Sequence, residues 1–127
     1  MVTQILRIPD ISLVWGEWHN WSNIEIDARS RSGVFVPNKK PGVYEARLSG
    51  EEERLTIGAT SNLRYRVREC LVKGRASHSA GKRIRKTEFT EQIEIRWAET
   101  DHPRCAEEEL HRQHRAQYGH LPKYTDH

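Results

Sequence analysis

The chain has 127 residues, enough for one domain with a modest core. Its 35% of hydrophobic residues is low for a globular protein, but four Trp, four Tyr and many Ile, Leu and Val residues argue against disorder. No apolar run approaches the ~20 residues that span a bilayer, and the first residues lack the apolar stretch of a secretory signal. We therefore expect a cytoplasmic protein with no membrane association. The formal net charge is only +3, but the charges are distributed unevenly along the chain.

Residues 1–40 predict a Trp-rich N-terminal arm that packs on the core. Trp15, Trp18 and Trp21 are spaced by three, which would place them on one face of a helical turn, although Gly16 weakens this prediction. Because each Trp can bury about 150–250 Å², we expect the arm to act as a hydrophobic cap. Stacking of a single-stranded base on one of these rings is the alternative. Residues 34–36, between two loop signals, predict a short strand.

Residues 43–48 and 54–59 predict two strands of an antiparallel hairpin, because only a short turn separates them. Polar N-cap candidates at 60–62 then introduce an amphipathic α-helix. Its core stripe is formed by Leu63, Val67, Cys70 and Leu71. The other cysteine, Cys105, has no zinc-finger or disulfide spacing with Cys70, and we expect both to be buried.

The second half of the chain predicts one more strand and one more helix. Residues 75–86 predict a basic loop with room for a short helix, and residues 93–97 alternate as a strand does. The last helix is expected to begin at Asp101 or Pro103, to run to Tyr118 and to stop at Gly119. The order predicts an α+β domain over residues 41–127, with a three-stranded, mostly antiparallel sheet flanked by helices.

Residues 54–86 form a strongly basic block, with ten Lys and Arg against one acid, Glu69. Such a block is typical of polyanion binding, and a solvated charged face is the alternative. The expected nucleic-acid contacts are Arg64, Arg68, Lys73, Arg75, Lys82, Arg83, Arg85 and Lys86.

Several short motifs occur in a characteristic order. Gly42-Val43-Tyr44 is followed by Thr56-Ile57-Gly58, by Arg66 eight residues after Gly58, and by a late glutamate-rich segment with Glu107. On the elements predicted above, this order resembles the GIY-YIG endonuclease superfamily over residues 41–125. The resemblance implies a small α+β nuclease domain that hydrolyses DNA with the help of a divalent metal ion.

The resemblance also implies a role for each residue. Glu107 would hold Mg²⁺ or Mn²⁺, Arg66 would bind the scissile phosphate, and Tyr44 would act as general base or orient the water. His78 in the basic loop would assist proton transfer or contact a phosphate. The chemistry is consistent with these residue types, because a planar guanidinium binds phosphate with two donors and Mg²⁺ needs few protein carboxylates when it keeps its waters. A phenol with a pKa of about 10 is a poor base, so Tyr44 would need nearby cations to ionise.

Three positions depart from the family pattern. Thr56 stands where the second tyrosine is expected, Cys70 stands where some members carry a histidine, and Thr125 stands where an asparagine is usual. If the protein is active, we expect Thr56 to face the same cleft as Tyr44.

Other functions remain open from the sequence alone. A nucleic-acid-binding module with a degenerate site is the first alternative, because Thr56 removes a phenol. A protein-interaction domain that uses the Trp residues is the second, and a transition-metal site formed by Glu107, His111 and His114 is a third. Specificity for DNA would come from the arm, the basic loop, a homodimer or a partner protein.

Overall fold

The structure is a computed structural model that describes residues 11–25 and 34–125. Its centre is a four-stranded antiparallel sheet with strand order β1-β4-β2-β3, so β2 lies inside the sheet and β3 forms an edge. The elements in chain order are β1 (His19–Asn20), α1 (Trp21–Glu25), β2 (Gly42–Leu48), β3 (Thr56–Thr60), η1 (Arg64–Val72), α2 (Ser79–Thr87), η2 (Thr90–Gln92), β4 (Ile93–Glu99) and α3 (Pro103–Tyr118).

The predicted α+β class and the β2–β3 hairpin are confirmed, but the prediction of three strands is wrong. The N-terminal segment adds β1, which pairs with β4 through His19 opposite Ile95 and Asn20 opposite Glu94. Residues 34–36 form no strand. Val36 is buried in the core instead, so its apolar character reflects packing rather than strand pairing.

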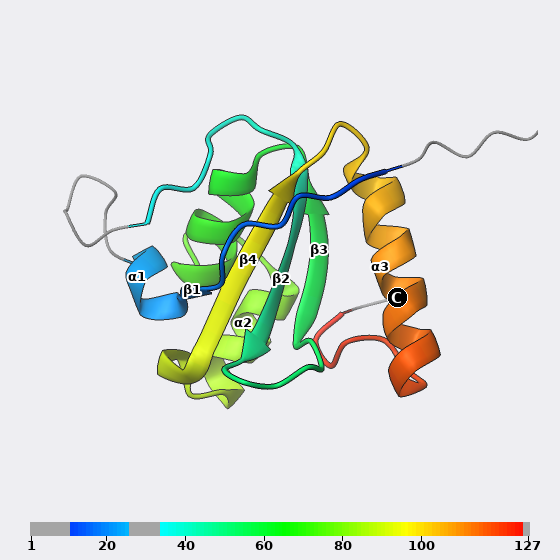
Figure 1. Cartoon of the computed structure of the whole chain (residues 1–127). Coiled ribbons are helices and arrows are strands. Elements are labelled where there is room, and N and C mark those ends of the chain that lie inside the picture. Colours follow the sequence, from blue (N-terminus) through cyan, green and yellow to red (C-terminus); the bar gives the residue numbers. More distant parts are fainter. Residues whose placement is uncertain (1–10, 26–33, 126–127) are drawn as a thin grey trace, which may run out of the picture.

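The sheet separates two layers (Figure 1). Helices η1 and α2 lie behind it in this view, the N-terminal segment crosses its front, and α3 stands beside β3. The three early tryptophans do not share a helical face. Trp21 lies in the core with η1 and α2, whereas Trp15 packs on the opposite side near Val43 and α3. The predicted helical turn is wrong because the chain through Trp15 and Trp18 is extended along the sheet.

The helix after β3 is a π-helix rather than the expected α-helix. At its end the Lys73 N–H donates to the Arg68 carbonyl, five residues back, at 2.9 Å. A wider turn places more residues in each repeat, so the buried face of this helix is broader than the stripe predicted at 3.6 residues per turn. Val67, Cys70 and Leu71 are buried as expected, but Arg68 is buried with them.

Helix α3 is fixed to the sheet edge through two buried histidines. The His111 ring lies 3.1 Å from the Ile57 carbonyl, and the His114 ring lies between the Arg54 N–H and the His120 carbonyl. The helix begins with Pro103 and ends at Gly119, whose φ of 81° is left-handed, as the sequence predicts. Cys70 is buried, but Cys105 on this helix is exposed, contrary to expectation. In the ranges described, no helix has the length and apolar character needed to cross a membrane.

Candidate active site

An open cleft of about 520 Å³ lies at the β3 edge of the sheet. Six positions singled out from the sequence line it, and each belongs to a different part of the fold. They are Tyr44 on β2, Thr56 on β3, Arg66 on η1, His78 before α2, Glu107 on α3 and Thr125 in the C-terminal tail. Thr56 therefore faces the same cleft as Tyr44, as expected. Residues far apart in the sequence meet here because β3 is an edge strand with η1 and α2 on one side and α3 on the other.

The Tyr44 side chain reaches this cleft by passing over Gly58, its partner on β3. A Cβ atom at position 58 would lie 2.3 Å from the Tyr44 hydroxyl oxygen, so no larger residue fits under the ring. A larger residue is also excluded at Gly42, because a Cβ atom there would lie 2.3 Å from the Ala98 carbonyl oxygen. Packing alone thus explains both motif glycines, and Gly58 allows the Tyr44 phenol to reach the cleft.

His78 connects Tyr44 to the start of α2. Its Nδ1 accepts from the Gly81 N–H at 2.9 Å and caps the helix, while its Nε2 lies 3.1 Å from the Tyr44 hydroxyl oxygen. A neutral imidazole with an accepting Nδ1 carries its proton on Nε2. His78 therefore donates to the Tyr44 oxygen, and the hydroxyl proton of Tyr44 can be donated into the cleft.

Both members of this pair are held in their neutral forms. Burial, together with the charges of Arg66 and Arg85, lowers the pKa of His78 to about 4. Burial also raises the pKa of the Tyr44 phenol; the Arg66 charge opposes this shift, and the Glu107 charge adds to it. The Tyr44 phenol is therefore protonated at neutral pH and can donate a hydrogen bond into the cleft.

Glu107 is the carboxylate that faces the cleft. Across residues 11–25 and 34–125, no group of three or more His, Cys, Asp and Glu side chains could hold a metal ion together. The alternative of a transition-metal site formed by Glu107, His111 and His114 has no support, because both histidine rings contact backbone groups. One hard carboxylate oxygen suits Mg²⁺ or Mn²⁺, which would take its other ligands from water and phosphate.

Of the eight predicted nucleic-acid contacts, four make interactions within the fold, and one of these four, Arg68, is buried. Arg68 is only 7% exposed, and Arg64 donates from Nε to the Val36 carbonyl at 2.8 Å. Arg85 donates to the Cys70 and Leu71 carbonyls at the end of η1, and Arg75 pairs with Glu69 at 3.1 Å. Lys82, Arg83 and Lys86 on α2 are exposed, and Lys73 is half-buried. A basic stretch does not reveal which cations contact carbonyls of a neighbouring helix.

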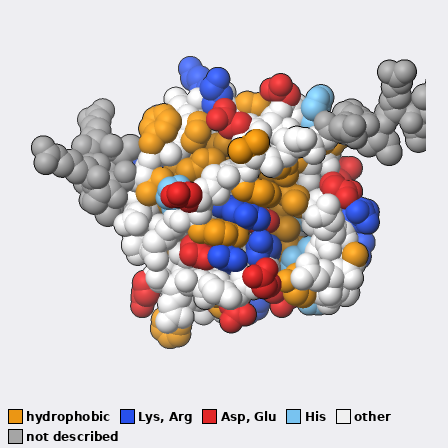
Figure 2. Space-filling model, in the orientation of Figure 1, with side chains coloured by type: hydrophobic (Ala, Val, Ile, Leu, Met, Phe, Trp, Pro, Cys, Tyr) orange, Lys and Arg blue, Asp and Glu red, His pale blue; other side chains and the backbone are white. Residues whose placement is uncertain are grey.

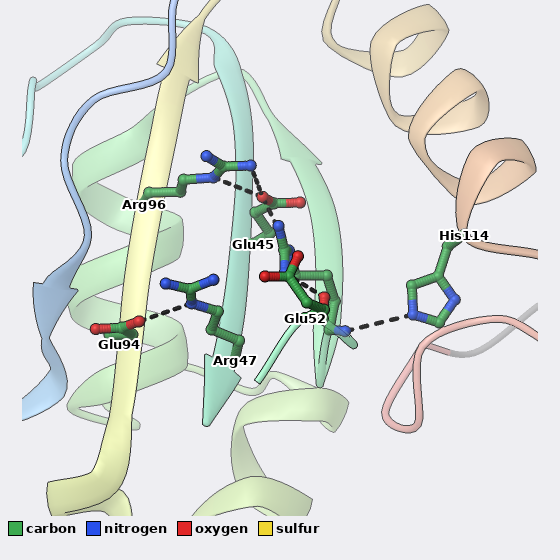
Figure 3. Close-up of polar contacts among 7 residues, drawn as sticks. Glu45, Arg47, Glu52, Glu94, Arg96 and His114 are labelled. Atoms are coloured by element: carbon green, nitrogen blue, oxygen red, sulfur yellow. Dashed lines mark hydrogen bonds and ion pairs between the residues drawn. The ribbon is translucent and has the colours of Figure 1, made fainter. Parts of the chain in front are cut away.

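A second charged cluster, which sequence reasoning missed, occupies the front of the sheet. Figure 2 shows Lys and Arg side chains at the centre of this face, with hydrophobic side chains above and between them and Asp and Glu side chains below. Glu45 is 3% exposed and binds Arg54 and Arg96, while Arg47 pairs with Glu94 at 2.6 Å (Figure 3). The strand period of two was the available signal, since Glu45 and Arg47 share the face opposite Tyr44.

No protein-family model, no curated protein and no solved structure matches the chain.

Proposed function

We propose that the protein is a divalent-metal-dependent DNA endonuclease that acts at the β3-edge cleft. The observation that carries this proposal is the convergence of Tyr44, Arg66, His78 and Glu107 from four elements on one open cavity. Phosphodiester hydrolysis needs an oriented water, positive charge on the phosphate and help for the leaving oxygen. The cleft offers a residue type for each requirement.

The four side chains would divide these tasks as follows. The Arg66 guanidinium binds two oxygens of the scissile phosphate, and the Tyr44 hydroxyl orients the attacking water or a phosphate oxygen. His78 holds Tyr44 in place through the hydrogen bond to its oxygen. Glu107 would hold Mg²⁺ or Mn²⁺, which when bound would neutralise charge on the phosphate and assist the leaving oxygen.

A nucleic-acid-binding module with a degenerate site is the second candidate. Two observations favour it: Thr56 replaces the expected tyrosine in the cleft, and burial raises the pKa of Tyr44. DNA is the proposed partner in both cases. A homodimer or a partner protein would supply specificity, and a cytoplasmic location is part of the same proposal.

Incubation with supercoiled plasmid plus Mg²⁺, Mn²⁺ or EDTA separates the two candidates. We expect the parent protein to nick or linearise the plasmid only with a divalent ion, and Glu107→Ala to abolish cleavage while DNA binding largely persists. Glu108→Ala is the matched control, because Glu108 is an exposed neighbour on α3 that does not line the cleft. Plasmid binding by the parent without cleavage at any divalent ion would favour the degenerate module.

A further inference from the structure

A second open cavity, of about 540 Å³, meets the cleft at Glu107. Helix α3 lines it with three arginines, Arg104, Arg112 and Arg115, and with Glu107 and Glu108. Since Glu107 lines both cavities, a ligand strand that leaves the cleft across α3 enters the second one. The basic block that the sequence pointed to lies elsewhere, on η1 and α2.

The three arginines differ in their partners. Arg112 makes two hydrogen bonds to Glu109, at 2.6 and 2.9 Å. Arg104 and Arg115 are exposed, and within the part of the chain that the structure describes no hydrogen bond or ion pair engages their guanidinium groups. They lie on one side of α3, three turns and ~16 Å apart, and so could reach phosphates several nucleotides apart along a strand.

Positive charge also lies at the other end of the cleft. Arg83 and Lys123 approach the ring of Tyr124, which lines the cleft, at 5.3 and 5.2 Å from its centroid. The cleft thus has cations on both sides: Arg83 on α2 and Lys123, which pairs with Glu88 at 3.3 Å, on one side, and Arg104 and Arg115 on α3 on the other. This distribution suits a polyanionic strand that crosses the cleft, because the affinity of such a strand depends mainly on phosphate contacts.

We propose that Arg104 and Arg115 bind backbone phosphates on the α3 side of the scissile bond, so that α3 supplies both the metal-holding carboxylate and half of the DNA-binding surface. This inference rests on the proposed nuclease function. It identifies the ligand as a nucleic-acid strand several nucleotides long, rather than a single nucleotide held in the cleft.

The test measures binding without turnover. In a Glu107→Gln background with EDTA, fluorescence anisotropy of a labelled DNA duplex is followed over a range of salt concentrations. We expect Arg104→Ala with Arg115→Ala to weaken binding about tenfold or more at low salt and to reduce the log–log salt slope by about two. The matched control is Lys40→Ala with Arg75→Ala, which removes the same charge from exposed positions that line neither cavity. All four substituted positions are exposed, so thermal melts of the variants should agree closely.

The proposal is overturned if the Arg104/Arg115 variant keeps the affinity and salt slope of its background, or changes them no more than the control does. It is also overturned if the background protein does not bind the duplex. The nuclease function is judged separately by plasmid cleavage with the parent protein and Glu107→Ala. Cleavage that persists while the arginine changes leave binding unaffected would reject only the α3 surface.

Discussion

Two successive residues of β2 face two different environments built from similar side chains. Tyr44 faces an open cleft with Arg66, His78 and Glu107, and its phenol makes one hydrogen bond, to His78. Glu45 faces the other side, is 3% exposed, and binds Arg54 and Arg96 through one carboxylate oxygen. Composition does not distinguish these groups. The two groups differ in whether their charged side chains form ion pairs and are shielded from solvent, because a site that binds a ligand must leave charged groups available to it.

The Glu45 cluster, which consists of Glu45, Arg54 and Arg96, is covered by tryptophan rings. The guanidinium of Arg54 lies 4.9 Å from the Trp18 centroid, and that of Arg96 lies 4.2 Å from the Trp15 centroid. Cation–π contacts of this kind stabilise cations that have lost part of their hydration. The front of the sheet therefore contributes to stability, whereas the cleft retains the polar groups that a ligand would need.

The largest effect on stability is expected from Glu45→Gln. The change leaves Arg54 and Arg96 close together, mostly buried and without their carboxylate, so we expect the free energy of unfolding to fall by about 3 kcal/mol. Urea denaturation measures it. Glu94→Gln is the matched control on the same face, because its Arg47 pair is more exposed and should contribute about 1 kcal/mol or less. Equal effects of the two changes would mean that the Glu45 cluster is not a closed unit.

Gly58→Ala is expected to damage the cleft itself. The added Cβ would displace the Tyr44 ring and break its contact with His78, at a cost of about 2 kcal/mol of stability. Plasmid cleavage should be lost even where the protein remains folded. Gly16→Ala is the control, since its Cβ would meet only the Trp97 carbonyl oxygen at 3.5 Å. Full cleavage by Gly58→Ala would show that the position of the phenol is irrelevant to the chemistry.

Thr56→Val tests whether the hydroxyl that Thr56 places in the cleft takes part in the proposed reaction. It removes a hydroxyl from the cleft at nearly constant shape, and we expect cleavage to slow by tenfold or more, or about 1.4 kcal/mol of transition-state stabilisation. Thr56→Ser retains the hydroxyl and should retain most of the rate. If the valine variant turns over like the parent in single-turnover assays, Thr56 serves only to pack the strand.

The last expected effect is a dependence of the free energy of unfolding on pH that comes from His78. Its pKa is about 4 in the fold, below its ordinary value of 6.5, so the unfolded chain binds the proton more readily. His78 should contribute no pH dependence above about 6.5. Between about pH 6.5 and pH 4, protonation of the unfolded chain at His78 should lower the free energy of unfolding. This loss should be complete below the folded pKa of about 4.

His78→Asn isolates this contribution, because asparagine can still cap α2 but does not titrate near neutral pH. Unfolding free energies of parent and variant are compared from pH 4 to 7.5. We expect the parent to lose more stability than the variant as the pH falls. Parallel curves would mean that His78 is protonated as easily in the fold as in the unfolded chain.

Local patterns in the sequence were sufficient for much of the fold. Alternation of apolar residues and a short turn predicted the β2–β3 hairpin, and Pro103 and Gly119 predicted the limits of α3. The resemblance to GIY-YIG nucleases, rather than any local pattern, implied that Tyr44, Arg66 and Glu107 share a site, and these three residues line one cleft. The predictions of the hairpin and of the limits of α3 succeeded because strand period, helix caps and turn chemistry depend on neighbouring residues.

The remaining features depend on contacts between distant segments. The π-helical turn of η1 buries Arg68, and the η1 carbonyls engage Arg85, so a uniformly basic stretch contains cations with unlike roles. The Tyr44–His78 contact and the closure of Glu45 under Trp18 likewise join residues separated by tens of positions. The sequence determined which chemical groups the chain carries, and tertiary packing decided which of them are neutralised within the fold and which face a ligand.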